Sequence, residues 1–371
     1  MVRLIDNDQV KALLTMADCI RVQEEAFKEL GTGDAVHRPR IDVYAPCERE
    51  DGYYRWGSME GASKALGIFA IRMKSDIVHW PRDAQGGWTE EKYCVRPGTY
   101  CGLVFLFSTR NGEPLAIIND GHLQHMRVGG GAGLGAKCLA RADSRIVGML
   151  GSGGMARTYL TAFCAVRPIK RVKVYSPTPE HREAFAKEMS RELGIEVEPV
   201  DSAREAVRGV DIVSTCTDAM RPTIQGEWLE PGMHVANLGP AEIGEDAYRR
   251  FDVKIRQGVG GWSPREPIER VEMERGMSPV AYIAGQEEEV ARIPKRDREL
   301  RGFGGDFPHF TDLVSGKAKG RTREGEITFY HNIGNQGLQF AAVGGWVYAR
   351  AKALGVGREL PTEWFLQDIR D

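Results

Sequence analysis

The stretch that decides the fold is VGMLGSGGMARTYL, residues 147–160, where an apolar run meets closely spaced glycines and then a helical pattern. Gly151, Gly153 and Ala156 form a G-x-G-x-x-A pattern. In this pattern the first glycine permits a tight exit from a strand, the second lets the backbone approach a pyrophosphate, and the alanine lets the helix pack closely. Glycine-rich turns also arise for purely steric reasons, so the neighbouring segments have to decide between the two interpretations.

The segments that follow alternate between strand and helix patterns. Strands are expected at 171–176, 195–200, 211–217, 234–239 and 253–257, and helices at 181–193 and 202–208. Repeated strand–helix units with short connections predict an α/β fold with a doubly wound parallel sheet of the Rossmann type. Because the glycine pattern opens the series, dinucleotide binding is favoured over the steric interpretation.

The residues after the second expected strand bear on the choice of coenzyme. The segment YSPTPEHR has Ser176, Thr178 and Arg182, and it has no carboxylate at the tip of the strand. An acid there would hold the ribose hydroxyls of NAD and repel a 2′-phosphate, whereas hydroxyls and a guanidinium suit a phosphate. NADP(H) is therefore favoured and NAD(H) remains open. An ordinary helix cap by Ser176 or Thr178 is the alternative.

The composition excludes several classes of protein. The 371 residues carry a formal net charge of −2, which favours neither nucleic acid nor an anionic membrane as a partner. No apolar run approaches the ~20 residues of a membrane-spanning helix. The seven cysteines are scattered and the eight histidines lack metal-ligand spacing, which predicts a cytoplasmic, metal-free protein with reduced thiols. The first residues, MVRLIDNDQVKALL, lack a signal-peptide pattern and predict a capped amphipathic helix.

Residues 1–125 show no strand–helix alternation. One long helix is expected over 7–35, and strands are expected within 66–76 and 98–120, the latter containing an Asn-Gly hairpin turn. A polar and aromatic excursion, 79–96, separates these strands. The pattern predicts an antiparallel α+β domain, which a helix starting at residue 122 joins to the nucleotide-binding sheet.

Three cations of this half lie in apolar, extended or glycine-rich surroundings: Arg40, Lys74 and Arg127. Such cations can be buried to bind an anion, and arginine can hold a carboxylate with two hydrogen bonds. A solvated surface cation is the simpler alternative for each one. Periodicity alone does not decide between them.

Nine stretches carry a family resemblance by their order and spacing: MADCIRVQEEAF, RPR, MKSD, GTYCGLVFLFSTRNGEPLAIIND, RVGGGAGLGAKCLAR, GSGGMA, DIVSTCT, PGMHVANLG and GEITFYHNIGNQGLQFAAVGGWVYARAKALGVG. From about residue 8 to the C-terminus the chain resembles the ornithine cyclodeaminase/mu-crystallin family. The resemblance implies a substrate-binding and dimerisation domain of residues 1–128 with 325–371, a Rossmann domain of residues 129–324, and a homodimer.

The resemblance also implies roles for single residues. Arg40, Lys74 and Arg127 match the positions that hold the substrate carboxylate, and Arg127 also contacts the nicotinamide side of the coenzyme. Further implied coenzyme contacts are Thr99, Gly154, Met155, Thr215, Thr217, Leu238, Gly239 and Asn332.

Several positions depart from the family pattern. Ala241 stands where cyclodeaminases carry the aspartate that binds the distal amine of ornithine, and Glu242 beside it would face the other way in an extended chain. Glu245 replaces a lysine, and Phe340 replaces a late aspartate. These changes weaken ornithine as the substrate. Reductases resembling mu-crystallin also lack the first aspartate, so imine reduction is compatible with its loss.

Two segments exceed the usual length of the family, 79–96 and about 258–320. The second is charged and glycine-rich, and we expect a solvated loop. The aromatic residues in or near the first segment either line an enlarged substrate pocket or pack the hairpin; they are Trp80, Trp88, Tyr93 and Tyr100.

The leading hypothesis is an NAD(P)H-dependent reductase of an α-imino acid, in which Lys74 and Arg127 act on the substrate. The substrate would be a cyclic ketimine or pyrroline carboxylate, or the imine of a keto acid and an amine. The first alternative is a cyclodeaminase of ornithine or lysine that uses bound NAD. The second is a non-catalytic, crystallin-like NADPH-binding protein.

Overall fold

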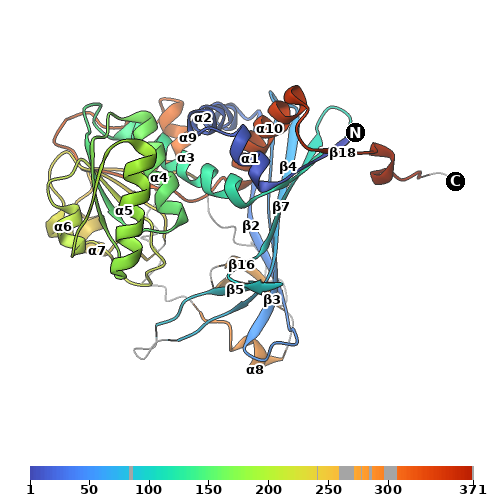
Figure 1. The fold of residues 1–371 in the computed structure, drawn as a ribbon, viewed down its shortest axis with the longest axis horizontal. Helices are drawn as coiled ribbons and strands as arrows, with labels where there is room; N and C mark the ends of the chain where they lie inside the picture. The colour runs from blue at the N-terminus through green and yellow to red at the C-terminus, as the bar shows by residue number, and fades with distance from the viewer. Residues whose placement is uncertain are drawn as a thin grey trace.

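Two sheets organise the part of the chain that the computed structural model describes, which is residues 1–82, 87–239, 241–258, 271–276, 278–283, 286–295 and 307–369 (Figure 1). The first is a seven-stranded sheet of order β11-β10-β9-β12-β13-β17-β14, in which every neighbouring pair is parallel. Its strands are β9 (Ile146–Leu150), β10 (Arg171–Tyr175), β11 (Glu196–Pro199), β12 (Ile212–Thr215), β13 (His234–Asn237), β14 (Val253–Arg256) and β17 (Thr328–His331). Short, continuously buried runs such as 212–215 are typical of a parallel sheet covered on both faces.

Helices connect these strands, and the doubly wound fold is confirmed. They are α4 (Gly154–Val166), α5 (Pro179–Leu193), α6 (Ala203–Val207) and α7 (Glu245–Tyr248). The strand β17 lies between β13 and β14, although we expected residues 325–371 with the first domain. Its four residues, three of them buried, are too few to be distinguished in sequence from the start of the helix that follows. The strand β17 is therefore part of the nucleotide-binding sheet.

The second sheet is mixed and has eleven strands in the order β15-β16-β2-β3-β4-β7-β8-β1-β18, with β5 on β4 and β6 on β5. The strands are β1 (Val2–Ile5), β2 (Ala35–Ala45), β3 (Gly52–Ser63), β4 (Ile68–His79), β5 (Glu91–Cys94), β6 (Arg96–Pro97), β7 (Cys101–Ser108), β8 (Pro114–Asn119), β15 (Val271–Arg275), β16 (Ser278–Ile283) and β18 (Arg358–Leu360). The Asn-Gly turn joins β7 to β8 as expected.

Helices cover one face of this sheet, toward the nucleotide-binding domain (Figure 1). They are α1 (Asn7–Leu13), α2 (Met16–Thr32), α3 (Gly121–Leu139) and α10 (Gln336–Leu354). The N-terminus of α10 touches β3 closely, because a Cβ on Gly337 would lie 1.8 Å from the carbonyl oxygen of Glu60. This contact fixes α10, and with it the residues of its first turn, over the sheet.

The N-terminal segment bears out one expectation and departs from another. The capped helix is confirmed as α1, which Asp6 caps, and residues Val2–Ile5 before it form a strand that pairs with β8 and β18. The single helix expected over 7–35 is two helices, since Thr15 caps α2 directly after α1 ends. The strand at Val2–Ile5 depends on partners far away in the sequence, whereas the division of the helix depends on the local cap at Thr15.

Part of the long insert is ordered in the mixed sheet. The β15–β16 hairpin adds to the edge of β2 through a parallel pairing of Ala281 with Asp42, so the solvated-loop expectation is wrong for these strands. The insert also supplies the short helices α8 (Glu287–Val290) and α9 (Phe310–Val314). Residues 259–270, 277, 284–285 and 296–306 of this segment lie outside the described residues. Within the described ranges, no helix has the length and apolar character needed to cross a membrane.

Candidate active site

The expected pyrophosphate turn joins β9 to α4. Gly151 has φ of 101°, and a Cβ there would lie 2.2 Å from the carbonyl oxygen of Cys216. Gly153 is the N-cap of α4 and faces open space, with no described atom within 4 Å of a Cβ there beyond its chain neighbours. The free N–H groups at the start of α4 therefore have room for phosphate oxygens. His125 of α3, which sequence reasoning missed, lies beside this turn, 3.0 Å from a Cβ on Gly154.

A cavity of about 220 Å³ lies next to the turn. It is lined by residues at or after the ends of β9, β10 and β12 and by the first residue of α6: Leu150, Gly151, Tyr175, Ser176, Pro177, Ala203, Thr217, Asp218, Ala219 and Thr223. In doubly wound sheets a dinucleotide binds outside the carboxyl ends of the strands, where the strand order reverses. Here that reversal is between β9 and β12. The turn and the cavity therefore fit the pyrophosphate and adenosine half of a dinucleotide.

Of the three residues expected to hold a 2′-phosphate, Ser176 lines this cavity and Arg182 is hydrogen-bonded to Ser176. Arg182 donates to the carbonyl oxygen of Ser176 (3.1 Å) and forms an ion pair with the exposed Asp201 (2.5 Å). The Ser176 hydroxyl accepts a hydrogen bond from Ser152 (2.9 Å). Thr178 is the N-cap of α5 but makes no side-chain capping bond, so its hydroxyl is not used in the way the alternative proposed.

Hydrogen bonds to the side chain of Glu242 connect the loops that follow β12 and β13. Its buried carboxylate accepts hydrogen bonds from Thr215 Oγ1 (2.9 Å), from the N–H (2.6 Å) and hydroxyl (2.8 Å) of Thr217, and from the N–H groups of Leu238 (3.1 Å) and Gly239 (2.5 Å). These are four of the expected coenzyme contacts. Glu242 thus holds in place the loops that carry these four residues, and its carboxylate is occupied by their donors.

We expect Glu242→Gln to weaken coenzyme binding and to lower the free energy of unfolding. Glutamine carries an NH2 group in place of one carboxylate oxygen. The buried N–H groups that this oxygen accepted from then have no partner, at a cost of about 1–3 kcal/mol. Coenzyme titration by fluorescence and chemical denaturation measure the two effects. Glu245→Gln, on an exposed side chain three residues away, is the matched control. Equal behaviour of the two variants would contradict this role.

A buried polar network joins the two domains beside α3. Asn332, which follows β17, donates to the carbonyl oxygen of Val128 (2.8 Å) and to the hydroxyl of Tyr159 (2.6 Å). Gln339 of α10 accepts from Arg127 Nη1 (3.1 Å) and donates to Gln23 (2.5 Å). The network fixes Arg127 between the sheet and the nucleotide-binding domain.

Arg127 is a buried cation without a carboxylate partner among the described residues. It is 7% exposed, and its guanidinium donates only to the amide oxygens of Gln124 (3.0 and 3.2 Å) and Gln339. Phe340, in place of the family's aspartate, puts its ring 5.0 Å from the guanidinium. Burial, followed by the charge of Arg72, lowers the pKa of Arg127 to about 9. The expectation that Arg127 is buried is confirmed, and the site is electrostatically suited to an anion.

Asp120 is the acid whose charge acts on Arg127, but it is already paired with another cation. It forms an ion pair with Arg72 of β4 (2.5 Å), and both residues are buried. The Arg72 guanidinium also lies 5.7 Å from the ring centroids of Tyr100 and Phe340. Asp120 therefore neutralises the charge of Arg72, whereas no described carboxylate neutralises the charge of Arg127.

One row of residues across four strands brings Lys74 to Asp42. The register pairs Asp42 with Gly57, Gly57 with Lys74, and Lys74 with Gly102. A Cβ on Gly57 would lie 1.9 Å from Asp42 Oδ1 and 3.0 Å from Lys74 Cε, so the two side chains meet over this glycine. Arg40 pairs with the same carboxylate (Nη2–Oδ2 2.6 Å). Both cations therefore lie at one buried aspartate.

Burial and two neighbouring guanidinium groups set the ionisation of this row. Burial, then Arg40 and Arg55, lowers the pKa of Lys74 well below its usual range. Burial raises the pKa of Asp42, but Arg40, Lys74 and Arg55 outweigh it and hold that pKa well below the ordinary carboxyl value. Lys74 Nζ forms no hydrogen bond or ion pair within the described residues. A lysine with a lowered pKa is suited to move a proton near neutral pH.

Arg55, whose charge acts on both Asp42 and Lys74, is itself held by two other acids. It is fully buried on β3, binds Asp76 through two hydrogen bonds (2.7 and 2.9 Å) and forms an ion pair with Glu90 (2.6 Å). Ser278 of the β16 hairpin donates to Asp42 and contacts the hydroxyl of Tyr44 (2.7 Å). The insert thus helps to position the acid beside Lys74.

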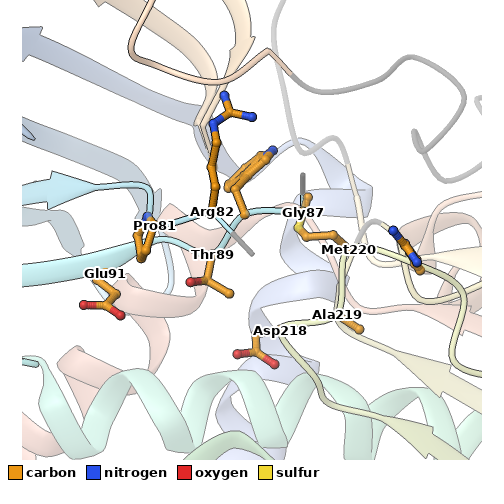
Figure 2. A pocket seen from close by; sticks show the side chains of 10 residues that line it. Pro81, Arg82, Gly87, Thr89, Glu91, Asp218, Ala219 and Met220 are labelled. Carbon is orange, nitrogen blue, oxygen red and sulfur yellow. The ribbon is translucent and has the colours of Figure 1, made fainter. Parts of the chain in front are cut away.

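A larger cavity, about 540 Å³, separates the 79–96 excursion from the nucleotide-binding domain (Figure 2). Arg82, Thr89 and other residues of the excursion face Asp218, Ala219 and Met220 of the loop after β12. The complete lining is Pro81, Arg82, Gly87, Trp88, Thr89, Glu91, Asp218, Ala219, Met220 and Arg221. Asp218 and Ala219 also line the smaller cavity. The excursion therefore borders the coenzyme side of the molecule.

The four aromatic residues of this region separate into different environments. Trp80 packs with Tyr44 in an apolar cluster, and Trp88 packs against the same cluster and also lines the larger cavity. Tyr93 pairs with Ile77 and Pro97 within the sheet. Tyr100 lies between Arg72 and Lys92, 5.8 Å from Lys92 Nζ. One common aromatic pocket is therefore not formed.

Thr99 lies in the turn after β6. Its hydroxyl donates to the carbonyl oxygens of Cys94 (2.5 Å) and Arg96 (2.7 Å). The side chain holds the β5–β6 turn, and a coenzyme contact by this residue stays a prediction. Within the described residues, no cluster of three or more His, Cys, Asp or Glu side chains is arranged to hold a metal ion.

The doubly wound sheet, the glycine turn and the cavity at the reversal of strand order define a dinucleotide-binding protein. Residues 2–353 match the model of the ornithine cyclodeaminase/mu-crystallin family, so the chain belongs to that family.

Three similar proteins illustrate the range of this family. A Delta(1)-pyrroline-2-carboxylate reductase of Bacillus cereus is 27% identical over 262 residues, 71% of this chain and 74% of the relative. The uncharacterized cyclodeaminase y4tK of Sinorhizobium fredii is 27% identical over 349 residues, 92% of each chain. The structure of Thermococcus litoralis Delta(1)-pyrroline-2-carboxylate reductase in complex with NADH and L-proline superposes with a TM-score of 0.73 at 26% identity, covering 97% of this chain and 100% of the other.

Proposed function

We propose that the protein reduces the C=N bond of an α-imino acid with NAD(P)H. The substrate is a cyclic ketimine or pyrroline carboxylate, or the imine of a keto acid and an amine. The observation that carries the proposal is the buried Arg127 guanidinium, which lacks a carboxylate partner among the described residues. A buried cation is costly without an anion, and a substrate α-carboxylate would supply one. The pyrroline-2-carboxylate reductases among the relatives support this substrate class.

In the proposed reaction, the bound coenzyme supplies a hydride to the imine carbon. Arg127 and Arg40 bind and orient the carboxylate, and Lys74 provides the proton that the imine nitrogen gains. Asp42 lies against Lys74 and Arg40 and offers a negative charge to a protonated imine. Correct placement of the substrate accounts for most of the acceleration.

The structure favours this reaction over cyclodeamination. Cyclodeamination of ornithine needs an acid that accepts the distal amine, and Ala241 offers none. The carboxylate of Glu242 is occupied by N–H and hydroxyl donors of the coenzyme-facing loops. Phe340 removes the second aspartate of the family pattern.

Oxidation of NADPH and NADH across a panel of cyclic imines, and of keto acids with and without amines, tests the proposal. We expect coenzyme consumption that depends on the imine and yields the corresponding amino acid. Tight NADPH binding without turnover on the whole panel would contradict the proposal and favour a binding protein.

The preference for NADP(H) is part of the proposal, and Arg182→Ala tests it. Removing this guanidinium should raise the KM for NADPH about tenfold or more and leave that for NADH nearly unchanged, because a charge-assisted hydrogen bond contributes about 1.5–3 kcal/mol. Its present partner, Asp201, is exposed and can release it. Arg191→Ala, near the other end of α5, serves as the control. An equal loss for both coenzymes would remove Arg182 from the 2′-phosphate site.

A cytoplasmic homodimer stays a prediction. The C-terminal segment projects from the mixed sheet (Figure 1) and exposes Trp364 (70%) and Leu366 (61%). Exposed apolar side chains in a projecting segment are typical of a protein–protein contact. Light scattering on the full chain measures the assembly.

A further inference from the structure

The extra strand β5 adds a fourth cation to the face that carries Lys74. In the antiparallel register Lys92 pairs with Val78 of β4, and directly opposed residues point to the same face of a sheet. Side chains alternate along β4, so Arg72, Lys74, Asp76 and Val78 share one face, which is buried. Lys92 therefore extends over the same face as Lys74. The strand belongs to the 79–96 excursion, which exceeds the usual length of the family.

The charges on this face are unbalanced. Arg40 pairs with Asp42, Arg72 with Asp120, and Arg55 with both Asp76 and Glu90. Three cations form no ion pair with a described carboxylate: Lys74, Lys92 and Arg127. Because Arg55 already takes two acids, the face holds two more cations than carboxylates. The α-carboxylate of one substrate would neutralise only one of them.

The surplus cations have different aromatic neighbours. Lys92 Nζ lies 5.8 Å from the centre of the Tyr100 ring, and the Arg127 guanidinium lies 5.0 Å from the centre of the Phe340 ring, while the Arg72 guanidinium lies 5.7 Å from both rings. A carboxylate at Arg127 and one at Lys92 therefore occupy different places on this face. Two acids act on the charge of Lys92, Glu90 and Asp76, and both are already paired with Arg55. Two separate anionic groups would complete the face better than one.

We infer that the substrate is an α-imino acid with a second carboxylate, which Lys92 binds. The inference rests on the proposed function, since it adds a second anion to the same substrate. The second carboxylate can belong to the side chain of the keto acid or to the amine partner. Its chemistry is the same in both cases, and Lys92 acts as a specificity-determining residue.

Three imines of matched size test the inference in the full-length enzyme with NADPH. They form from 2-oxoglutarate and methylamine, from pyruvate and glycine, and from 2-oxopentanoate and methylamine. The last lacks the second carboxylate of the first at equal chain length. We expect kcat/KM to be tenfold or more higher for one dianionic imine than for the monoanionic one. Which dianionic imine is preferred identifies the source of the carboxylate.

Lys92→Met should abolish this preference and leave the monoanionic substrate within about twofold of the wild-type enzyme. Lys92→Arg should retain part of the preference. Lys64→Met, on an exposed lysine in the turn after β3, is the control and should change neither value. A preference that survives in Lys92→Met, or a loss of the same size for all three imines, overturns the inference.

A binding measurement separates this inference from the proposed function. With oxidised coenzyme bound, the wild-type protein should bind N-methylglutamate or N-(carboxymethyl)alanine tenfold or more tightly than N-methylnorvaline, and Lys92→Met should bind all three alike. If no imine is turned over but this binding difference is present, the proposed reductase activity is refuted while the binding of the second carboxylate by Lys92 is supported. Equal binding in the wild-type protein would refute the site whether or not imines are reduced.

Discussion

Replacement of Arg127 by lysine is expected to lower kcat/KM for imine reduction by about a hundredfold or more. Lysine keeps the positive charge but cannot hold a carboxylate with two parallel hydrogen bonds. It also loses the contacts to Gln124 and Gln339 that fix the guanidinium between the domains. Loss of one partner of a buried, hydrogen-bonded charge pair costs about 2–5 kcal/mol. Steady-state kinetics of Arg127→Lys and Arg127→Ala measure the effect.

The two Arg127 variants should be impaired to a similar extent, because the geometry of the fork matters as well as its charge. Arg145→Lys, on an exposed arginine just before β9, is the matched control and should keep normal turnover. Melting temperatures establish that all three variants are folded. Near-normal turnover in Arg127→Lys would show that the bidentate clamp is wrong.

Replacement of Lys74 by methionine is expected to lower kcat about a hundredfold to ten-thousandfold, the usual contribution of a positioned proton donor. The ammonium form donates the proton, so activity falls as the pH rises through the pKa of Lys74. Burial and the neighbouring arginines lower that pKa well below the usual lysine value. The alkaline limb of the wild-type pH profile should therefore lie well below pH 10.4, the ordinary lysine pKa.

The pH profile distinguishes proton donation from simple packing. In Lys74→Met the residual activity should no longer show this alkaline limb, whereas a packing defect would lower the rate and leave the limb in place. Arg127 has a pKa of about 9 and also titrates in the alkaline range. The profile of Arg127→Ala shows which part of the limb belongs to each group. A limb that is unchanged in Lys74→Met refutes its role as donor.

The nucleotide-binding half was predictable because its determinants are local. The G-x-G-x-x-A pattern specifies a strand, a turn with positive φ and a helix within ten residues, and the structure confirms each of them. The strands β1, β17 and β16 were not predictable. They have four to six residues, and each is stabilised by partners far away in the sequence.

The cations of the site were visible in the sequence, but their partners were not. The glycines after Arg127 indicated close packing, and they do lie against other chain segments, such as Thr158 and Gln257. The meeting of Asp42 with Lys74 depends on the register of three strands, and a shift by one residue would separate them. Alternation along β4 could have indicated that Lys74, Arg72 and Asp76 share a face. Lys92 had no such indication, since β5 is only four residues long.

The central claim is that the enzyme transfers a hydride to the imine carbon of an α-imino acid, and isotope transfer tests it most directly. The enzyme is incubated with 1-pyrroline-2-carboxylate and with NADPH or NADH that carries deuterium on one face of C4. The proposed function predicts proline with one deuterium at Cα for each coenzyme oxidised, from one of the two labelled faces only. The contradicting result is unlabelled proline or none from either face, with ornithine or lysine instead releasing ammonia without net change in coenzyme.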